Sequence, residues 1–125
     1  MSKKALLLLL GISFAIEAVF TSAGFIAPNW TLGQFKLGVS PDTLFLGYTL
    51  AWMLLFVTLI IGLAFWLVRR GDRAGWVLAY LLGFWWTGIG IGIFVSFGRP
   101  DNLALDSAKG LLLLVFAKLS HPARA

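Results

Sequence analysis

The chain has no cysteine and only one histidine among its 125 residues. Without thiols, disulfides, thiolate nucleophiles and cysteine-ligated zinc or iron–sulfur centres are excluded. The single histidine, His121, lies in the C-terminal tail, so the apolar segments hold neither a histidine cluster for a metal nor a Ser–His pair. We therefore predict no catalytic residues, no metal and no cofactor, and an enzyme is the least favoured class of function.

Charge is also scarce, since Asp, Glu, Lys and Arg make up 12% of the chain and hydrophobic residues 60%. Soluble domains are about a quarter charged and about half apolar. This composition indicates an integral membrane protein. The net charge of +5 comes from basic residues at the ends of apolar runs, which indicates orientation in a membrane and argues against nucleic-acid binding.

Four apolar segments approach the length of about 20 residues that a membrane-spanning helix needs. We predict an all-α, integral membrane four-helix bundle with one domain, residues 1–125, and helices at about 5–27, 44–68, 74–97 and 102–119. The fourth segment reaches this length only if its helix starts near Asn102, just after Pro100. The alternative is three spans followed by an amphipathic helix at the membrane surface.

The first segment, "MSKKALLLLLGISFAI", has the basic start and apolar stretch of a signal peptide, and Thr21–Ala23 has the small residues of a cleavage site. The apolar run nevertheless continues to about Ala27, which is long enough to span a bilayer. We expect an uncleaved first helix.

Basic residues predict the orientation of the bundle. They precede the first helix, fill the turn between the second and third, and follow the fourth: Lys3, Lys4, Arg69, Arg70, Arg73, Lys118 and Arg124. In the other two loops, Lys36 and Arg99 are balanced by Asp42 and Asp101. By the positive-inside rule, both termini of this multi-pass protein face the cytoplasm, in the cell inner (cytoplasmic) membrane.

The third predicted helix carries two series of small residues that permit close helix packing in lipid. One series is Gly75, Ala79, Gly83 and Thr87, and the other is Gly88, Gly92 and Ser96. These small residues allow either close packing within the bundle or contact with helices of a partner protein. The expected partners are membrane lipids, with a homo-oligomer or a larger membrane complex formed through Gly75, Ala79, Gly83, Gly88 and Gly92.

Glu17 lies inside the first apolar segment, where an ionised carboxylate costs about 3 kcal/mol or more. Ser13 and Thr21 share its side of the helix. At 1.5 Å per residue, Glu17 lies about 12 Å below the outer boundary of the hydrocarbon core, and Lys109 of the fourth segment about 10 Å below it. The match predicts a Glu17–Lys109 ion pair. Alternatively, Asp106 takes Lys109, and Glu17 is left to a ligand or a proton.

From this polar layer we predict an outward-opening intramembrane polar pocket for a small or lipid-like molecule, which the protein binds or transports. Its residues are Glu17, Lys109, Asp106, Thr21, Thr87, Trp52, Trp85 and Trp86. The alternative for the layer is a structural ion pair that is packed shut. The alternative for the whole protein is a non-catalytic accessory subunit of a larger membrane complex.

The small size, the four helices and the motif "AIEAV" (Ala15–Val19) resemble the small multidrug resistance transporters. That resemblance implies proton-coupled export with Glu17 as the proton site. The long loop at 28–43 and the charged start of the fourth segment depart from the short-loop pattern of that family. We therefore do not assign the chain to it.

Overall fold

The computed structural model describes residues 2–34 and 36–121, and within them the regular structure is helical, without strands. The all-α prediction is confirmed. The elements are α1 (Ser2–Ile26), α2 (Pro28–Gln34), α3 (Pro41–Arg69), α4 (Arg73–Phe97), α5 (Pro100–Asn102), the π-helical turn η1 (Leu103–Ser107) and α6 (Ala108–Ser120).

Three helices, α1, α3 and α4, are long and apolar enough to cross a membrane, so the chain has the features of a membrane protein. The segment formed by α5, η1 and α6 runs without a break from Pro100 to Ser120 and measures about 30 Å. Its crossing of the membrane, the four-span count and the cytoplasmic termini stay predictions.

Two helices start where a side chain caps the exposed backbone N–H groups. Ser40 accepts a hydrogen bond from the Thr43 backbone N–H (3.2 Å), and Thr43 Oγ1 accepts one from the Ser40 N–H (2.7 Å). This capping box starts α3 at Pro41, before the predicted residue 44. Asp72 caps α4 by accepting a hydrogen bond from the Ala74 N–H at 3.0 Å.

The fourth segment begins earlier than predicted and contains a turn that the sequence does not reveal. Its N-cap position is Arg99, with Pro100 in the first turn, whereas we predicted a start near Asn102. The π turn η1 buries Ser107, whose hydroxyl donates to the backbone carbonyl of Thr87 on α4 at 3.1 Å. Such a turn changes which faces of α6 meet the neighbouring helices.

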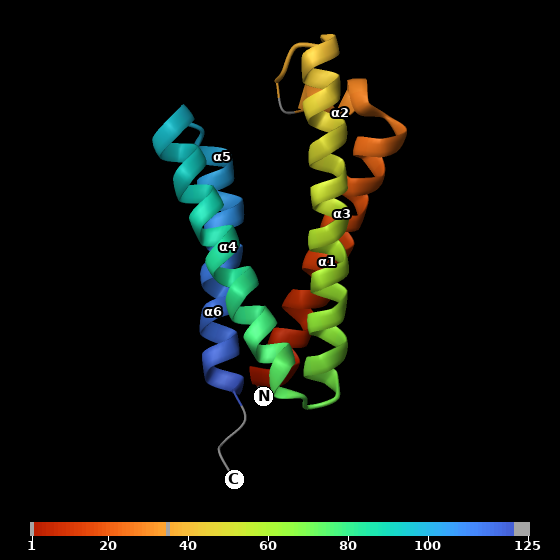
Figure 1. Ribbon diagram of the computed structural model, residues 1–125. Helices are drawn as coiled ribbons and strands as arrows, with labels where there is room; N and C mark the ends of the chain where they lie inside the picture. The colour runs from red at the N-terminus through yellow and green to blue at the C-terminus, as the bar shows by residue number, and fades with distance from the viewer. Residues whose placement is uncertain (1, 35, 122–125) are drawn as a thin grey trace.

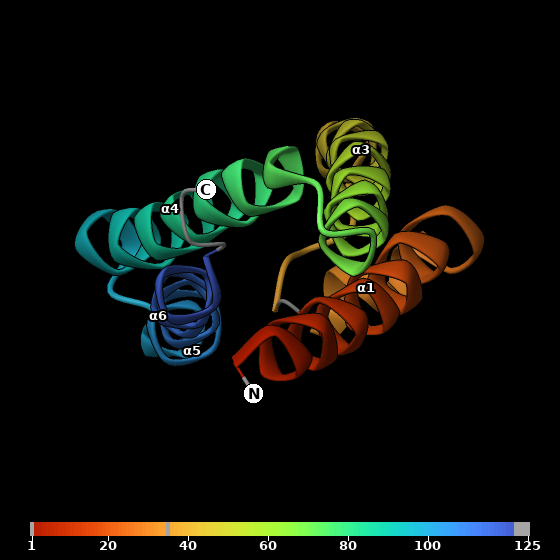
Figure 2. The same cartoon turned by 90° about the horizontal axis from the view of Figure 1, so that it is seen from below.

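The helices form two arms that meet at one end of the molecule and diverge toward the other (Figure 1). One arm pairs α1 with α3, and the other pairs α4 with η1 and α6. The short turn at 70–72 joins α3 to α4 where the arms meet, and Figure 2 shows all four long helical segments from that end. A buried core joins the arms there: Leu6, Leu10, Ile61, Ala64, Val68, Trp76, Ala79, Leu82, Trp86, Leu113 and Ala117.

The first small-residue series of α4 is used inside the chain. A Cβ atom added to Gly75 would lie 2.5 Å from the backbone nitrogen of Val68 on α3. One added to Gly83 would lie 2.8 Å from Leu114 of α6. The second series differs, because Cβ atoms at Gly88 and Gly92 would meet no described atom within 4 Å. Its docking of a partner stays a prediction.

We predict that Gly110→Ala destabilises the fold, because α6 approaches the α4 backbone at this residue. The added Cβ would lie 2.6 Å from both the Gly83 carbonyl oxygen and the Thr87 backbone nitrogen, and backbone cannot rotate away. We expect a loss of about 1–3 kcal/mol in the free energy of unfolding. Thermal unfolding in detergent, followed by circular dichroism, measures it.

Gly88→Ala is the matched control, since it adds the same methyl group to α4 in open space. Alanine also favours a helix more than glycine does, so the melting temperature should be unchanged or higher. Equal melting temperatures for Gly110→Ala and the wild type would contradict the close approach.

Candidate functional site

Glu17 and Lys109 form the ion pair that depth counting predicts. Lys109 Nζ lies 3.0 Å from Glu17 Oε1 and donates a hydrogen bond to it. The pair links α1 to α6 and therefore joins the two arms. Glu17 is only 7% exposed, and Ser13 and Thr21 on the same side of α1 are also buried. The polar side of α1 faces the protein interior, as expected.

Trp86 is the second partner of the Lys109 ammonium. Lys109 Nζ lies 3.9 Å from the centroid of the Trp86 ring, and this tryptophan of α4 is itself buried. The electron-rich face of an indole attracts a cation, and the attraction is stronger where water is excluded. Lys109 thus contacts a carboxylate from α1 and a π face from α4. Both contacts offset the free-energy cost of removing the Lys109 ammonium from water.

Hydroxyl groups extend this polar layer from α1 toward α3. The Thr58 hydroxyl donates to the Leu54 carbonyl at 2.7 Å, so Thr21 is the donor in the 3.3 Å bond between the two threonine oxygens. Ser13 is fully buried, and its Oγ makes no hydrogen bond to the described residues. A buried hydroxyl without a hydrogen-bond partner destabilises the fold. The Thr21 hydroxyl has such a partner, whereas the Ser13 hydroxyl lowers the stability.

The remaining predicted site residues are dispersed. Thr87 belongs to the contact between α4 and η1, where its hydroxyl donates to the Gly83 carbonyl at 2.7 Å. Asp106 is half-buried in η1. Trp52 of α3 and Trp85 of α4 line a groove that neither Glu17 nor Lys109 lines. Among the described residues, no group of three His, Asp or Glu side chains lies together to hold a metal ion.

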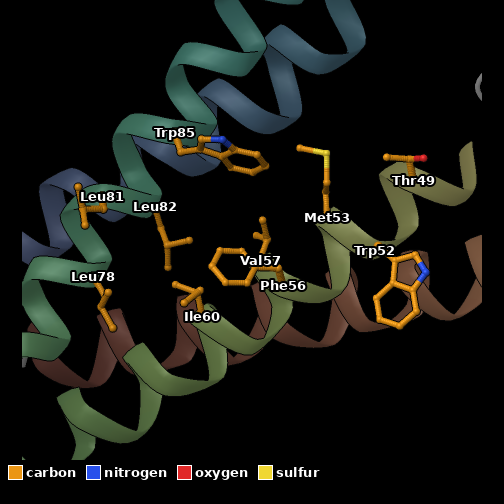
Figure 3. Close-up of a pocket in the computed structure, with 10 residues that line it drawn as sticks. All are labelled: Thr49, Trp52, Met53, Phe56, Val57, Ile60, Leu78, Leu81, Leu82 and Trp85. Carbon is orange, nitrogen blue, oxygen red and sulfur yellow. The ribbon is translucent and has the colours of Figure 1, made fainter. Parts of the chain in front are cut away.

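A groove of about 740 Å³ lies between α3 and α4, and Figure 3 shows the side chains that line it. The two arms diverge between these helices (Figure 1). Its lining is apolar and rich in aromatic side chains. Those from α3 are Thr49, Trp52, Met53, Phe56, Val57 and Ile60, and those from α4 are Leu78, Leu81, Leu82 and Trp85. Of the eight predicted site residues only Trp52 and Trp85 line it, and Glu17 and Lys109 do not. A ligand or proton role for that pair stays a prediction.

Sequence reasoning missed most of the groove residues. Their spacing on α3 follows one helix face, from Thr49 through Met53 and Phe56 to Ile60, and a helical wheel groups them. However, α3 is apolar on every side, so no contrast in polarity separates a face that lines a groove from a face against lipid. Predicting the groove would also have required knowing which residues of α4 face α3.

The chain was compared with protein-family models, curated proteins and solved structures, and none of them matches it. Its function is therefore inferred from the chemistry of the groove and of the ion pair.

We predict that the Glu17–Lys109 pair is a structural link, which a double-mutant cycle measures. Lys109→Leu should cost about 3–5 kcal/mol, because it leaves the Glu17 carboxylate buried without a counter-charge. The double variant Glu17→Leu with Lys109→Leu should lose much less, since neither charge remains. Unfolding of the wild type, Glu17→Leu, Lys109→Leu and the double variant in detergent gives the coupling free energy.

A double variant that is destabilised by the sum of the two single changes would show that the side chains do not interact. Lys118→Leu is the control for loss of a lysine from α6, because this side chain is exposed near the end of the helix. It should leave the free energy of unfolding within about 0.5 kcal/mol of the wild type.

Proposed function

We propose that this protein binds a lipid-like molecule in the groove between α3 and α4, within the hydrocarbon layer of the cell inner membrane. The observation that carries the proposal is the groove itself. Its volume of about 740 Å³ falls within the range of about 300–1,000 Å³ that is typical of ligand sites. Nine of its ten lining side chains are apolar or aromatic, as in most small-molecule sites.

The position of the groove favours a ligand that arrives through the membrane. Both walls belong to helices that are long and apolar enough to span a bilayer. Met53, Phe56 and Leu81 line the groove and are each more than half exposed, so the groove is open along its side. A molecule dissolved in lipid enters such a groove laterally, without crossing a layer of water.

The predicted orientation gives the groove a direction. The arms diverge toward the start of α3 and the end of α4 (Figure 1). If both termini face the cytoplasm, this wider end faces outward. The proposed site is then an outward-opening groove, and Glu17 with Lys109 holds its two walls together from the opposite side of the bundle.

Photo-crosslinking tests this function with a dodecyl chain that carries a diazirine and ends in a methyl ether. In the wild-type protein, reconstituted in lipid, we expect labelling on α3 and α4 groove peptides, located by mass spectrometry. Met53→Trp should reduce this labelling several-fold, because the larger side chain fills the groove.

Leu59→Trp is the matched control on the same helix. Leu59 and Met53 are similarly exposed, 60% and 56%, but only Met53 lines the groove. Labelling that is spread evenly over the lipid-facing surfaces, or lowered equally by the two variants, would count against a binding site.

A second candidate, an accessory subunit of a membrane complex, is favoured by the bare backbone at Gly88 and Gly92. Small residues of this kind let a partner helix approach closely in lipid. Under this proposal, the wild-type protein co-purifies from native membranes with a fixed partner, and Gly88→Ile with Gly92→Ile loses it. Wild-type protein that is stable and alone after mild extraction would count against this candidate.

A further inference from the structure

Most of the basic side chains gather at the end of the molecule where the two arms meet. Figure 1 shows the start of α1, the turn at 70–72 and the end of α6 at this end, and Figure 2 looks at it directly. The basic residues of this end come from all three segments and are all exposed: Lys3, Lys4, Arg69, Arg70, Arg73 and Lys118. We call this surface the basic end.

Acidic side chains do not balance the charge of the basic end. Among the described residues, Asp72 is the only acidic one there, and its carboxylate accepts a backbone hydrogen bond at the start of α4 (3.0 Å). At the opposite end, Lys36 and Arg99 are balanced by Asp42 and Asp101. The basic end therefore has an excess of positive charge that the opposite end lacks.

The lengths of the helices indicate the depth of this charge in a membrane. The 29 residues of α3 and the 25 of α4 measure about 43 and 37 Å, against a hydrocarbon core of about 30 Å. If each helix is centred, Arg69 at the end of α3 and Arg73 at the start of α4 lie about 4–6 Å outside the core. The headgroup layer is about 5–7 Å thick on each side, so both residues reach the level of the lipid phosphates.

One guanidinium group of the basic end is held in position. The guanidinium carbon of Arg70 lies 4.6 Å from the centroid of the Trp66 ring. Trp66 is 50% exposed and lies one turn before the end of α3, at the interfacial depth that tryptophan prefers. A cation–π contact does not use guanidinium N–H groups as donors to oxygen. The planar fork of Arg70 can therefore still bind two oxygens of a phosphate.

We infer that the basic end binds the phosphate of an anionic phospholipid headgroup, and that Arg70 donates hydrogen bonds to that phosphate. The other basic side chains attract the headgroup without a fixed geometry. A lipid is favoured because the charges lie at headgroup depth and extend over three helices that cross or approach the same boundary. A zwitterionic lipid is bound less well, because its own cation opposes the attraction.

Electron paramagnetic resonance of spin-labelled lipids tests this inference on the protein reconstituted in phosphatidylcholine vesicles. The spectra give the association constant of a labelled phosphatidylglycerol relative to that of labelled phosphatidylcholine. We expect a ratio of about three to ten for the wild type at about 0.1 M salt. The ratio should fall toward one at about 1 M salt, where charges are screened beyond about 3 Å.

Arg70→Gln removes one positive charge and the guanidinium fork, and it should lower this ratio about two- to five-fold. Lys36→Gln is the matched control, because it removes one exposed positive charge from the opposite end. It should leave the ratio unchanged. The melting temperature of each variant confirms that it is folded.

A wild-type ratio close to one would overturn the inference, and this result is expected if the basic end instead bound an acidic protein or a nucleic acid. Equal losses in Arg70→Gln and Lys36→Gln would also overturn it. Inorganic phosphate, added at matched ionic strength, should not displace the labelled phosphatidylglycerol, and displacement would assign the surface to a soluble phosphate. None of these results depends on the groove, so the proposed function is tested separately.

Discussion

The ion pair between Glu17 and Lys109 is the constraint on which the rest of the structure depends. It connects the two arms above the core where they meet, and a broken pair would leave a charge in a medium that solvates it poorly. The walls of the groove belong to different arms, so the groove has a defined width only while the arms hold a fixed angle. Lys109 also rests on Trp86, whose chain neighbour Trp85 lines the groove.

The size of the side chains between α3 and α4 explains why the groove lies on that side. Near the turn, Gly75 lets the backbone of α4 approach Val68 of α3 almost to contact. Further along α4, Leu78, Leu82 and Trp85 replace glycine at the facing positions, and the helices separate. On its other side, α4 stays close to α6 because Gly83 and Gly110 face each other. Helices α3 and α4, which belong to different arms, therefore diverge, whereas α4 and α6 stay packed together within one arm.

The sequence was sufficient for the three long apolar helices, although it gave a loop where α2 lies. It was also sufficient for the partner of Glu17, because depth along a helix follows from counting residues at a fixed rise. It was not sufficient for the π turn at Leu103–Ser107, which arises where Ser107 reaches the backbone of Thr87 on another helix. It also did not reveal the groove. The depth of a residue in the membrane follows from its position along its own helix. The direction in which an apolar face of that helix points depends on packing against the other helices.

Glu17 and Lys109, the charged residues that suggested a ligand pocket, contact each other, and the groove is left to apolar chemistry. In lipid, apolar chemistry alone does not select a ligand, because bilayer chains are as apolar as the lining and surround it in excess. Selectivity must come from a difference between the ligand and those chains.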